Sequence, residues 1–196
     1  MNDYNSKIIT IKFIPEKENQ INEFINSIKN FGNLSIINEN ENFNISDILQ
    51  KPEDKNKLLL WINKNKDFKT KLLFKLSRDG GTIDKFHELC DNIKDNLILI
   101  RSTNKTIFGS YCTWIWNKIG SDFTVNDGFL FNLTKDEKYE NNNQRIHQGC
   151  SDHGPYIYDK FYFEYTMKKC YIASNQFLEK IGTNDVEEVE IFQILI

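Results

Sequence analysis

The fold is set by residues 72–116, which read LLFKLSRDGGTIDKFHELCDNIKDNLILIRSTNKTIFGSYCTWIW. Apolar runs at 72–76, 97–100 and 106–116 are separated by polar turn residues, and this pattern predicts three strands. Between the first two runs, Thr82 is a suitable N-cap for a short helix with one apolar face, formed by Ile83, Phe86, Leu89 and Cys90. The stretch is therefore predicted to be a folding unit of strands and one helix.

The composition is that of a folded protein with a sizeable core. The chain has 196 residues, of which 39% are hydrophobic and 27% charged, and a length of this kind fits one domain with a small extension. A net charge of −3 disfavours nucleic acid as a partner, since phosphate binding usually needs a basic face. No signal peptide or membrane span is recognisable, so we predict a cytoplasmic protein without membrane insertion. The four cysteines contain no CxxC pair and are predicted to be free thiols.

Residues 1–50 are predicted to form a small strand-helix-strand extension followed by an Asn/Glu-rich linker, and residues 51–196 to form the main domain. A helix is expected to begin at Pro52, and further strands at 129–133, 156–165, 169–174 and 186–196. Residues 134–154 are the longest polar segment and are interpreted as a functional or mobile loop. The last strand is predicted to be wet at its acidic start and buried at its end.

With these segments in place, the chain from about Pro52 onwards resembles the TLDc domain family. The resemblance rests on short pieces in a fixed order, namely 72–80 (LLFKLSRDG), 86–91 (FHELCD), 97–100 (LILI), 108–111 (FGSY), 128–133 (GFLFNL), 154–156 (GPY) and 189–192 (VEIF). Three positions depart from the family pattern. Gly81 replaces an aromatic residue, Ser110 replaces a glycine, and Ile157-Tyr158 replace Phe-Gly-Gly.

The resemblance implies an α+β fold in which two antiparallel β-sheets pack as a sandwich flanked by short helices. It also implies a role in oxidative-stress resistance and, as in several family members, binding to the vacuolar proton pump and regulation of its assembly. The residues to which it assigns a structural role are Arg78, Asp79, Gly80, Gly109, Gly154 and Pro155. For Arg78 and Asp79, the residues themselves predict a turn that locks a strand to the following helix.

Two enzymatic alternatives arise from the residue types. Ser77, His87 and either Glu88 or Glu190 would supply the groups of a hydrolase, but no Gly-x-Ser-x-Gly elbow is present and nothing in the spacing sets a nucleophile beside a base. A half-buried histidine with a local hydrogen bond accounts for His87 more simply. Cys150, flanked by two histidines, would serve a thiol-dependent peroxidase if a resolving thiol, Cys112 or Cys170, lay near it.

His147, Cys150 and His153 have a His-x2-Cys-x2-His spacing that could hold zinc, with Asp152 or Cys170 as a fourth ligand. Structural zinc sites usually contain paired ligands such as CxxC, so a chance arrangement is the preferred interpretation. No cofactor or metal is therefore predicted.

Loops on a rigid scaffold commonly carry binding function. We therefore predict a non-enzymatic interaction module whose binding surface combines the 134–158 loop with the acidic start of the last strand. The residues assigned to this surface are Glu187, Glu188, Glu190, His147 and Tyr156. The predicted partner is a protein, with subunits of the vacuolar proton pump as the expectation from the resemblance.

Overall fold

The computed structural model of the chain describes residues 42–62, 68–117, 122–125, 127–140, 144–147, 153–157, 161–164, 166–172 and 185–195. The chain divides into two compact units, residues 1–40 and 41–196, and every described residue belongs to the second. The strand-helix-strand prediction for the first 40 residues lies outside the described part. No helix among the described residues has the length and apolar character needed to cross a membrane.

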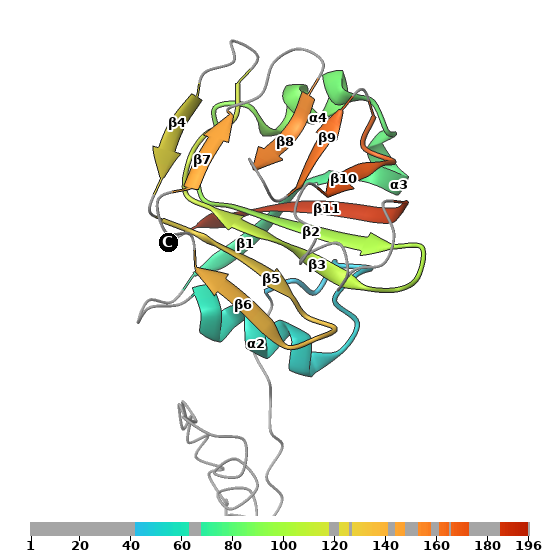
Figure 1. The fold of residues 1–196 in the computed structure, drawn as a ribbon. Helices are drawn as coiled ribbons and strands as arrows, with labels where there is room; N and C mark the ends of the chain where they lie inside the picture. The colour runs from blue at the N-terminus through green and yellow to red at the C-terminus, as the bar shows by residue number, and fades with distance from the viewer. Residues whose placement is uncertain are drawn as a thin grey trace, which may run out of the picture. The chain divides into compact units, whose positions relative to one another are not determined.

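A six-stranded antiparallel sheet forms the middle of the second unit (Figure 1). Its strand order is β1-β11-β2-β3-β5-β6, so the strand that comes last in the sequence lies between β1 and β2. These strands are β1 (Lys69–Lys75), β2 (Asn96–Ser102), β3 (Ile107–Cys112), β5 (Phe129–Asn132), β6 (Glu137–Glu140) and β11 (Val186–Leu195). β2 and β3, two of the predicted strands, form a hairpin, and β11 confirms the predicted final strand.

A five-stranded antiparallel sheet has the order β10-β9-β8-β7-β4. Its strands are β4 (Asp122–Val125), β7 (Gln144–His147), β8 (His153–Ile157), β9 (Phe161–Glu164) and β10 (Cys170–Ile172). The helices are α2 (Pro52–Ile62), α3 (Leu76–Asp79) and α4 (Ile83–Cys90). Thr82 is the N-cap of α4, where its hydroxyl accepts the amide of Lys85, as its position predicts.

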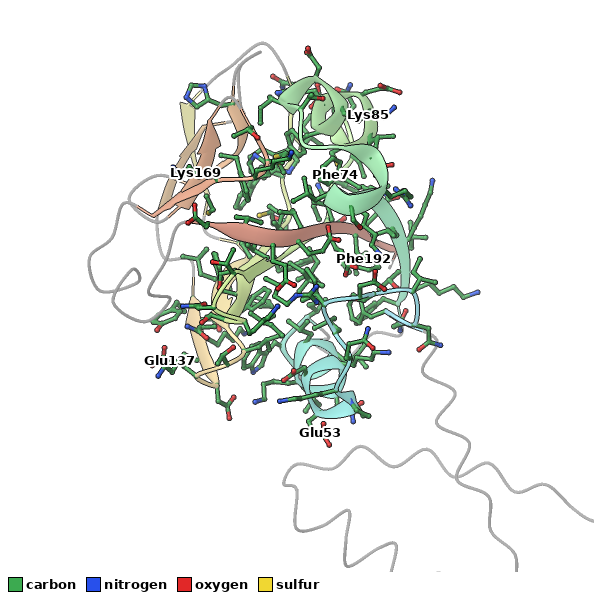
Figure 2. The ribbon with its side chains drawn as sticks, turned by 90° about the vertical axis from the view of Figure 1, so that its right-hand side faces the viewer. Glu53, Phe74, Lys85, Glu137, Lys169 and Phe192 are labelled. Carbon is green, nitrogen blue, oxygen red and sulfur yellow. The ribbon has the colours of Figure 1, made fainter. Side chains whose placement is uncertain are left out.

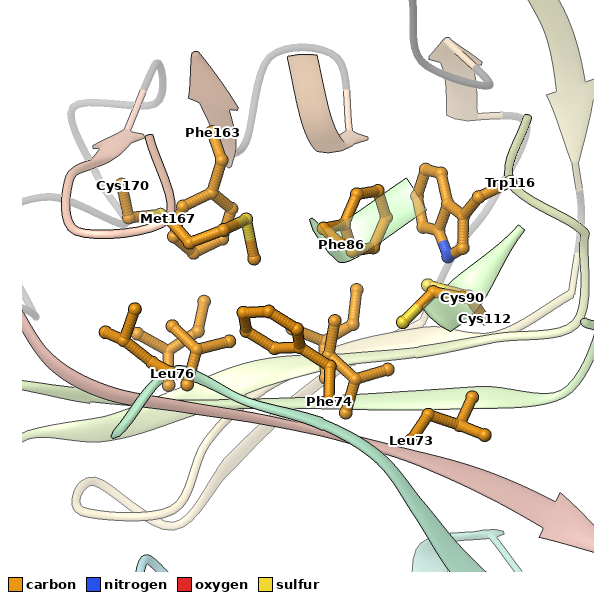
Figure 3. Packing of buried hydrophobic residues seen from close by; sticks show 14 of the residues in the cluster. Leu73, Phe74, Leu76, Phe86, Cys90, Cys112, Trp116, Phe163, Met167 and Cys170 are labelled. Atoms are coloured by element: carbon orange, nitrogen blue, oxygen red, sulfur yellow. The ribbon is translucent and has the colours of Figure 1, made fainter. Parts of the chain in front are cut away.

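The six-stranded sheet is buried on both faces. On one face, Phe74 and Ile191 share a cluster with Phe86 of α4, Phe163 of β9 and Cys170 of β10 (Figure 3). On the other face, a second cluster joins the sheet to α2 and to residues 43–49, and its members include Phe43, Leu49, Leu58, Leu97, Phe131 and Phe192. Figure 2 shows Phe74 and Phe192 on opposite sides of β11. Alternate residues of β11 therefore belong to different clusters, as expected for a central strand.

Gly109 of β3 is required by close packing between neighbouring strands. A β-carbon at this position would lie 1.9 Å from the carbonyl oxygen of Ile98 and 2.9 Å from the ring of Phe131. Both contacts are closer than real β-carbons allow, so only glycine fits without a shift of the β2 backbone.

The prediction of antiparallel sheets with short helices is confirmed, but two details of the chain's organisation differ. The 134–158 segment is not one loop, because β6, β7 and β8 lie within it. β6 and β7 contain few apolar residues and pair through backbone hydrogen bonds, so the hydrophobic pattern gave no sign of them, whereas the strand predicted at 156–165 overlaps both β8 and β9. The segment predicted as an Asn/Glu-rich linker at the end of residues 1–50 also differs in part, because Phe43, Ile48 and Leu49 are buried in the core.

Candidate interaction site

The acidic start of β11 is less exposed than predicted. Glu187 is exposed, but Glu188 is only 4% exposed and Glu190 is fully buried. The period-two pattern of the strand places Glu190 on the same face as Phe192 and Ile194, both of which are buried. Of the three glutamates, only Glu187 is therefore exposed to solvent. The carboxylates of Glu188 and Glu190 have partners inside the domain.

The buried carboxylate of Glu190 binds a segment that is remote in sequence. It accepts hydrogen bonds from the hydroxyl of Ser46 and, over 2.7 Å, from the backbone amide of Asp47. Lys75 of β1 is paired with Glu190 in the sheet, and its Nζ lies 3.8 Å from the same carboxylate. Burial raises the pKa of Glu190 above its ordinary value, against the opposing effect of these hydrogen bonds and of Lys75. We refer to Glu190, Ser46 and the Asp47 amide as the Glu190 clasp.

Glu188 also serves the fold. Its Oε1 atom accepts the backbone amide of Ser77 at 3.1 Å and the amide of Val189 at 3.0 Å. The first of these bonds satisfies an amide at the start of α3, where backbone donors lack helical partners. Glu188 thus joins the last strand to the turn that follows β1.

Glu187 lies in a cluster of charged side chains contributed by four segments. Its carboxylate is 3.0 Å from Nε of Arg101 and 2.7 Å from Nζ of Lys105, and the hydrogen bond from Lys105 is the main cause of its lowered pKa. Arg101 also donates to the carbonyl of Asp47, whose side chain pairs with Lys75. We call Asp47, Lys75, Arg101, Lys105 and Glu187 the hairpin-end cluster.

Arg78 and Asp79 tie the end of β1 to α3. The guanidinium donates to both oxygens of Asp79 at 2.8 Å and to the carbonyl of Leu73 at 2.8 Å. Asp79 also accepts the backbone amide of Lys75. The hydrogen bond from Arg78 is the main cause that holds the pKa of Asp79 below its ordinary value. The chain leaves α3 through Gly80 at φ +84°, a conformation that favours glycine.

Ser77 and His87 do not form a hydrolase pair in the structure. Ser77 is exposed on α3, whereas the His87 side chain is fully buried on α4. Nε2 of His87 donates to the carbonyl of His153 at 2.9 Å, and Nδ1 lies 2.7 Å from Oδ1 of Asp91. Both ring nitrogens are therefore engaged with oxygen atoms, and His87 connects α4 to β8.

The cysteines at 90, 112 and 170 are free and buried. Burial raises the pKa of the Cys112 thiol to about 12, and it raises the pKa of Cys90 and of Cys170 well above the ordinary value. Because the thiolate is the reactive form, neither Cys112 nor Cys170 suits the role of a resolving thiol. Cys150 lies outside the described residues, so its reactivity stays a prediction.

The remaining candidates come from β7 and β8. His147 and Tyr156 form a backbone pair between these strands, and their side chains lie outside the described part. His153 is partly exposed at the start of β8, and Gly154 and Pro155 after it are buried. A β-carbon on Gly154 would lie 2.8 Å from the sulfur of Met167. Among the described residues, no group of three or more His, Cys, Asp or Glu side chains could hold a metal ion.

Sequence reasoning missed most of the hairpin-end cluster. Asp47, Lys75 and the pair of Arg101 and Lys105 come from three separate segments, and their meeting with Glu187 depends on the position of β11 between β1 and β2. The burial of Glu190 could have been inferred from its alternation with Phe192 and Ile194. Ser46 carried no such signal, because its partner is 144 residues away in the sequence.

The family model of the TLDc domain matches residues 43–195. This match covers most of the chain and begins at Phe43, one of the core residues that precede α2. The chain therefore belongs to the TLDc domain family. No curated protein matches it.

Proposed function

We propose that this chain is a non-enzymatic interaction module of the TLDc type that acts in oxidative-stress resistance in the cytoplasm. Its partner is a protein, and subunits of the vacuolar proton pump are the partner to test first. In the same proposal, the two antiparallel sheets pack as a sandwich and residues 1–50 are an extension to it, although 43–49 contribute to its core. Membership of the TLDc family supports this assignment.

The observation that carries the proposal is the hairpin-end cluster. Four segments bring charged groups together there, and the side chains of Asp47 and Lys105 are 62% and 70% exposed. Exposed charges of both signs on a rigid sheet suit the polar rim of a protein interface, where they select the partner and accelerate encounter. The proposed surface contains this cluster, with Glu187 at its centre and His147 and Tyr156 as additional contacts. Glu188 and Glu190 support the surface from within.

Both enzymatic alternatives lose support from the surroundings of His87 and of the buried cysteines. His87 uses both ring nitrogens in contacts within the fold, so it has no free base to offer Ser77. Cys112 and Cys170 are buried thiols with raised pKa values, which makes a thiol pair with Cys150 unfavourable.

The interaction is tested by capture of purified proton-pump subunits on the immobilised chain. Glu187→Lys places three positive charges together and should weaken capture at least roughly tenfold, an effect of about 1.4 kcal/mol. Glu88→Lys is the matched control, because Glu88 is also exposed and also pairs with a lysine, at 2.7 Å, but lies on α4. Equal capture by both variants would contradict the proposed surface, and no capture by the wild type would contradict the partner.

The peroxidase alternative is tested on the same preparation. We expect wild type and Cys150→Ser to consume peroxide at the same negligible rate. A rate that depends on Cys150 would assign an enzymatic role instead. A zinc assay of both proteins tests the His147, Cys150 and His153 hypothesis, and we expect no stoichiometric metal.

A further inference from the structure

Residues 42–50 form a strap that lies on the six-stranded sheet without joining it. The segment consists of turns and bends, and no strand pairing connects it to β1, β2 or β11. Its apolar side chains are nevertheless inserted in the core, since Phe43, Ile48 and Leu49 are at most 2% exposed. The strap is therefore held by side-chain burial and by individual hydrogen bonds.

Three of these hydrogen bonds join the backbone of the strap to side chains of the sheet, and Asn42 donates from the strap to the carbonyl of Phe68. Phe43 donates its amide to Oγ1 of Thr70 at 3.1 Å, and Arg101 donates to the carbonyl of Asp47 at 2.6 Å. Glu190 accepts two donors, the Asp47 amide and the Ser46 hydroxyl. Ser46 in turn accepts the amide of Leu49 at 2.9 Å and so fixes the turn that buries Ile48 and Leu49.

We propose that the Glu190 clasp fastens residues 42–50 as a strap that opens and closes while the sheet beneath it stays folded. The hydrogen-bond ladder of the sheet is complete without the strap, so opening breaks no strand pairing. Burial of three apolar side chains and the hydrogen bonds to Thr70 and from Arg101 are opposed by the entropy of ordering the segment, and the clasp shifts this balance towards the closed state. Segments at the edge of a domain that lack backbone pairing are commonly the first to open.

The charge on Glu190 sets how firmly the strap is held. The charged groups around the carboxylate are Lys75 of β1, Glu188 of β11, and Asp47 in the strap itself. Burial raises the pKa of Glu190 in the closed state despite Lys75 and the two hydrogen bonds. Because opening returns the carboxylate towards water, the open state binds protons less readily than the closed state. Acidification should therefore close the strap and higher pH should loosen it.

Opening of the strap releases a segment that lies near the start of the second unit. Fully extended, residues 42–50 span up to about 30 Å. The strap shares Asp47 with the hairpin-end cluster, but this inference does not require that the cluster binds a partner.

Hydrogen exchange of the full-length chain, followed by mass spectrometry, tests the strap directly. In Glu190→Ala, the amides of 46–49 should exchange roughly tenfold faster or more, because a bond to a charged acceptor is lost, and they should open at a lower free energy than those of β2 and β3, whose exchange follows global unfolding. Glu88→Ala is the control, since it removes an exposed carboxylate on α4. Strap amides with the same opening free energy as those of β2 would overturn the proposal, as would unchanged exchange in the strap.

Two further variants keep the test decisive. If Glu190→Ala does not fold, Ser46→Ala removes the hydroxyl that donates to Glu190 and accepts the amides of Ile48 and Leu49, and it should accelerate exchange of the amides of 46–49. Exchange corrected for its intrinsic pH dependence should show less strap opening at about pH 5 than at about pH 7 in the wild type. Glu190→Gln, which cannot ionise, should lose this pH effect. The same pH response in both proteins would assign control of the strap to another group and overturn the role of Glu190.

Discussion

Two carboxylates fasten this domain, and they do so in opposite ways. Asp79 binds within its own turn, where Arg78 and the Lys75 amide are its partners and its side chain remains partly in contact with solvent. Glu190 is fully buried and binds Ser46 and Asp47, which are more than 140 residues away. The pKa of Asp79 is lowered, chiefly by Arg78, whereas burial raises the pKa of Glu190. The local turn therefore stabilises the charged form of Asp79, whereas burial of the remote contact destabilises the charged form of Glu190.

The largest expected effect is that of Glu190→Ala. It leaves the Ser46 hydroxyl and the Asp47 amide without their acceptor in a buried site, so the free energy of unfolding should fall by about 3 kcal/mol. Urea denaturation followed by fluorescence measures this change. A loss of unfolding free energy no larger than that of Glu187→Ala would show that the buried carboxylate stabilises the fold no more than an exposed one does. The contrast between Glu190 and Asp79 would then not hold.

Asp79→Ala should cost less. It removes the acceptor of the Lys75 amide and of two bonds from Arg78, but these donors are close enough to solvent to regain water, so we expect a loss of about 1–2 kcal/mol. The same denaturation experiment provides the comparison. If the loss exceeds that of Glu190→Ala, the local turn rather than the remote clasp is the stronger fastener.

Arg78→Lys sharpens the local half of the comparison. Lysine keeps the charge but cannot bind both oxygens of Asp79 and the carbonyl of Leu73 together, so the free energy of unfolding should fall by about 0.5–1 kcal/mol. An unchanged unfolding midpoint would mean that charge alone, without the planar geometry of the guanidinium, maintains the turn.

The smallest expected effect is on the pH dependence of stability, to which Asp79 and Glu190 should contribute with opposite signs. Asp79 has a lowered pKa, so its contribution to stability is complete above the ordinary value of 3.8 and is lost as the pH falls through the folded-state pKa. Glu190 has a raised pKa, so its ionisation destabilises the fold as the pH rises from the ordinary value of 4.5 through the folded-state pKa. Stability of Asp79→Asn and Glu190→Gln, measured against the wild type between about pH 3 and about pH 7, should diverge in opposite directions. Parallel curves for the two variants would contradict this assignment.

The same contrast explains what the sequence could reveal. The Ser-Arg-Asp-Gly-Gly turn, the Thr82 cap and the β2–β3 hairpin were predictable, because their partners lie within a few residues of one another. The Glu190 clasp was not, since nothing near Ser46 or Glu190 indicates a contact across the whole domain. β6 and β7 were missed for a related reason, because their polar residues reveal no hydrophobic period and their pairing is a property of the backbone.

The place of β11 in the sheet also bears on how the domain forms during synthesis. β1 and β2 are made early, yet neither pairs with the other, since each pairs with β11. At ordinary translation rates, β2 leaves the ribosome on the order of ten seconds before β11 does. During that interval two apolar strand edges and both faces of the sheet lack their central strand, and the strap lacks Glu190. The nascent chain therefore needs protection from aggregation throughout this interval. The interval ends only when β11 inserts between β1 and β2.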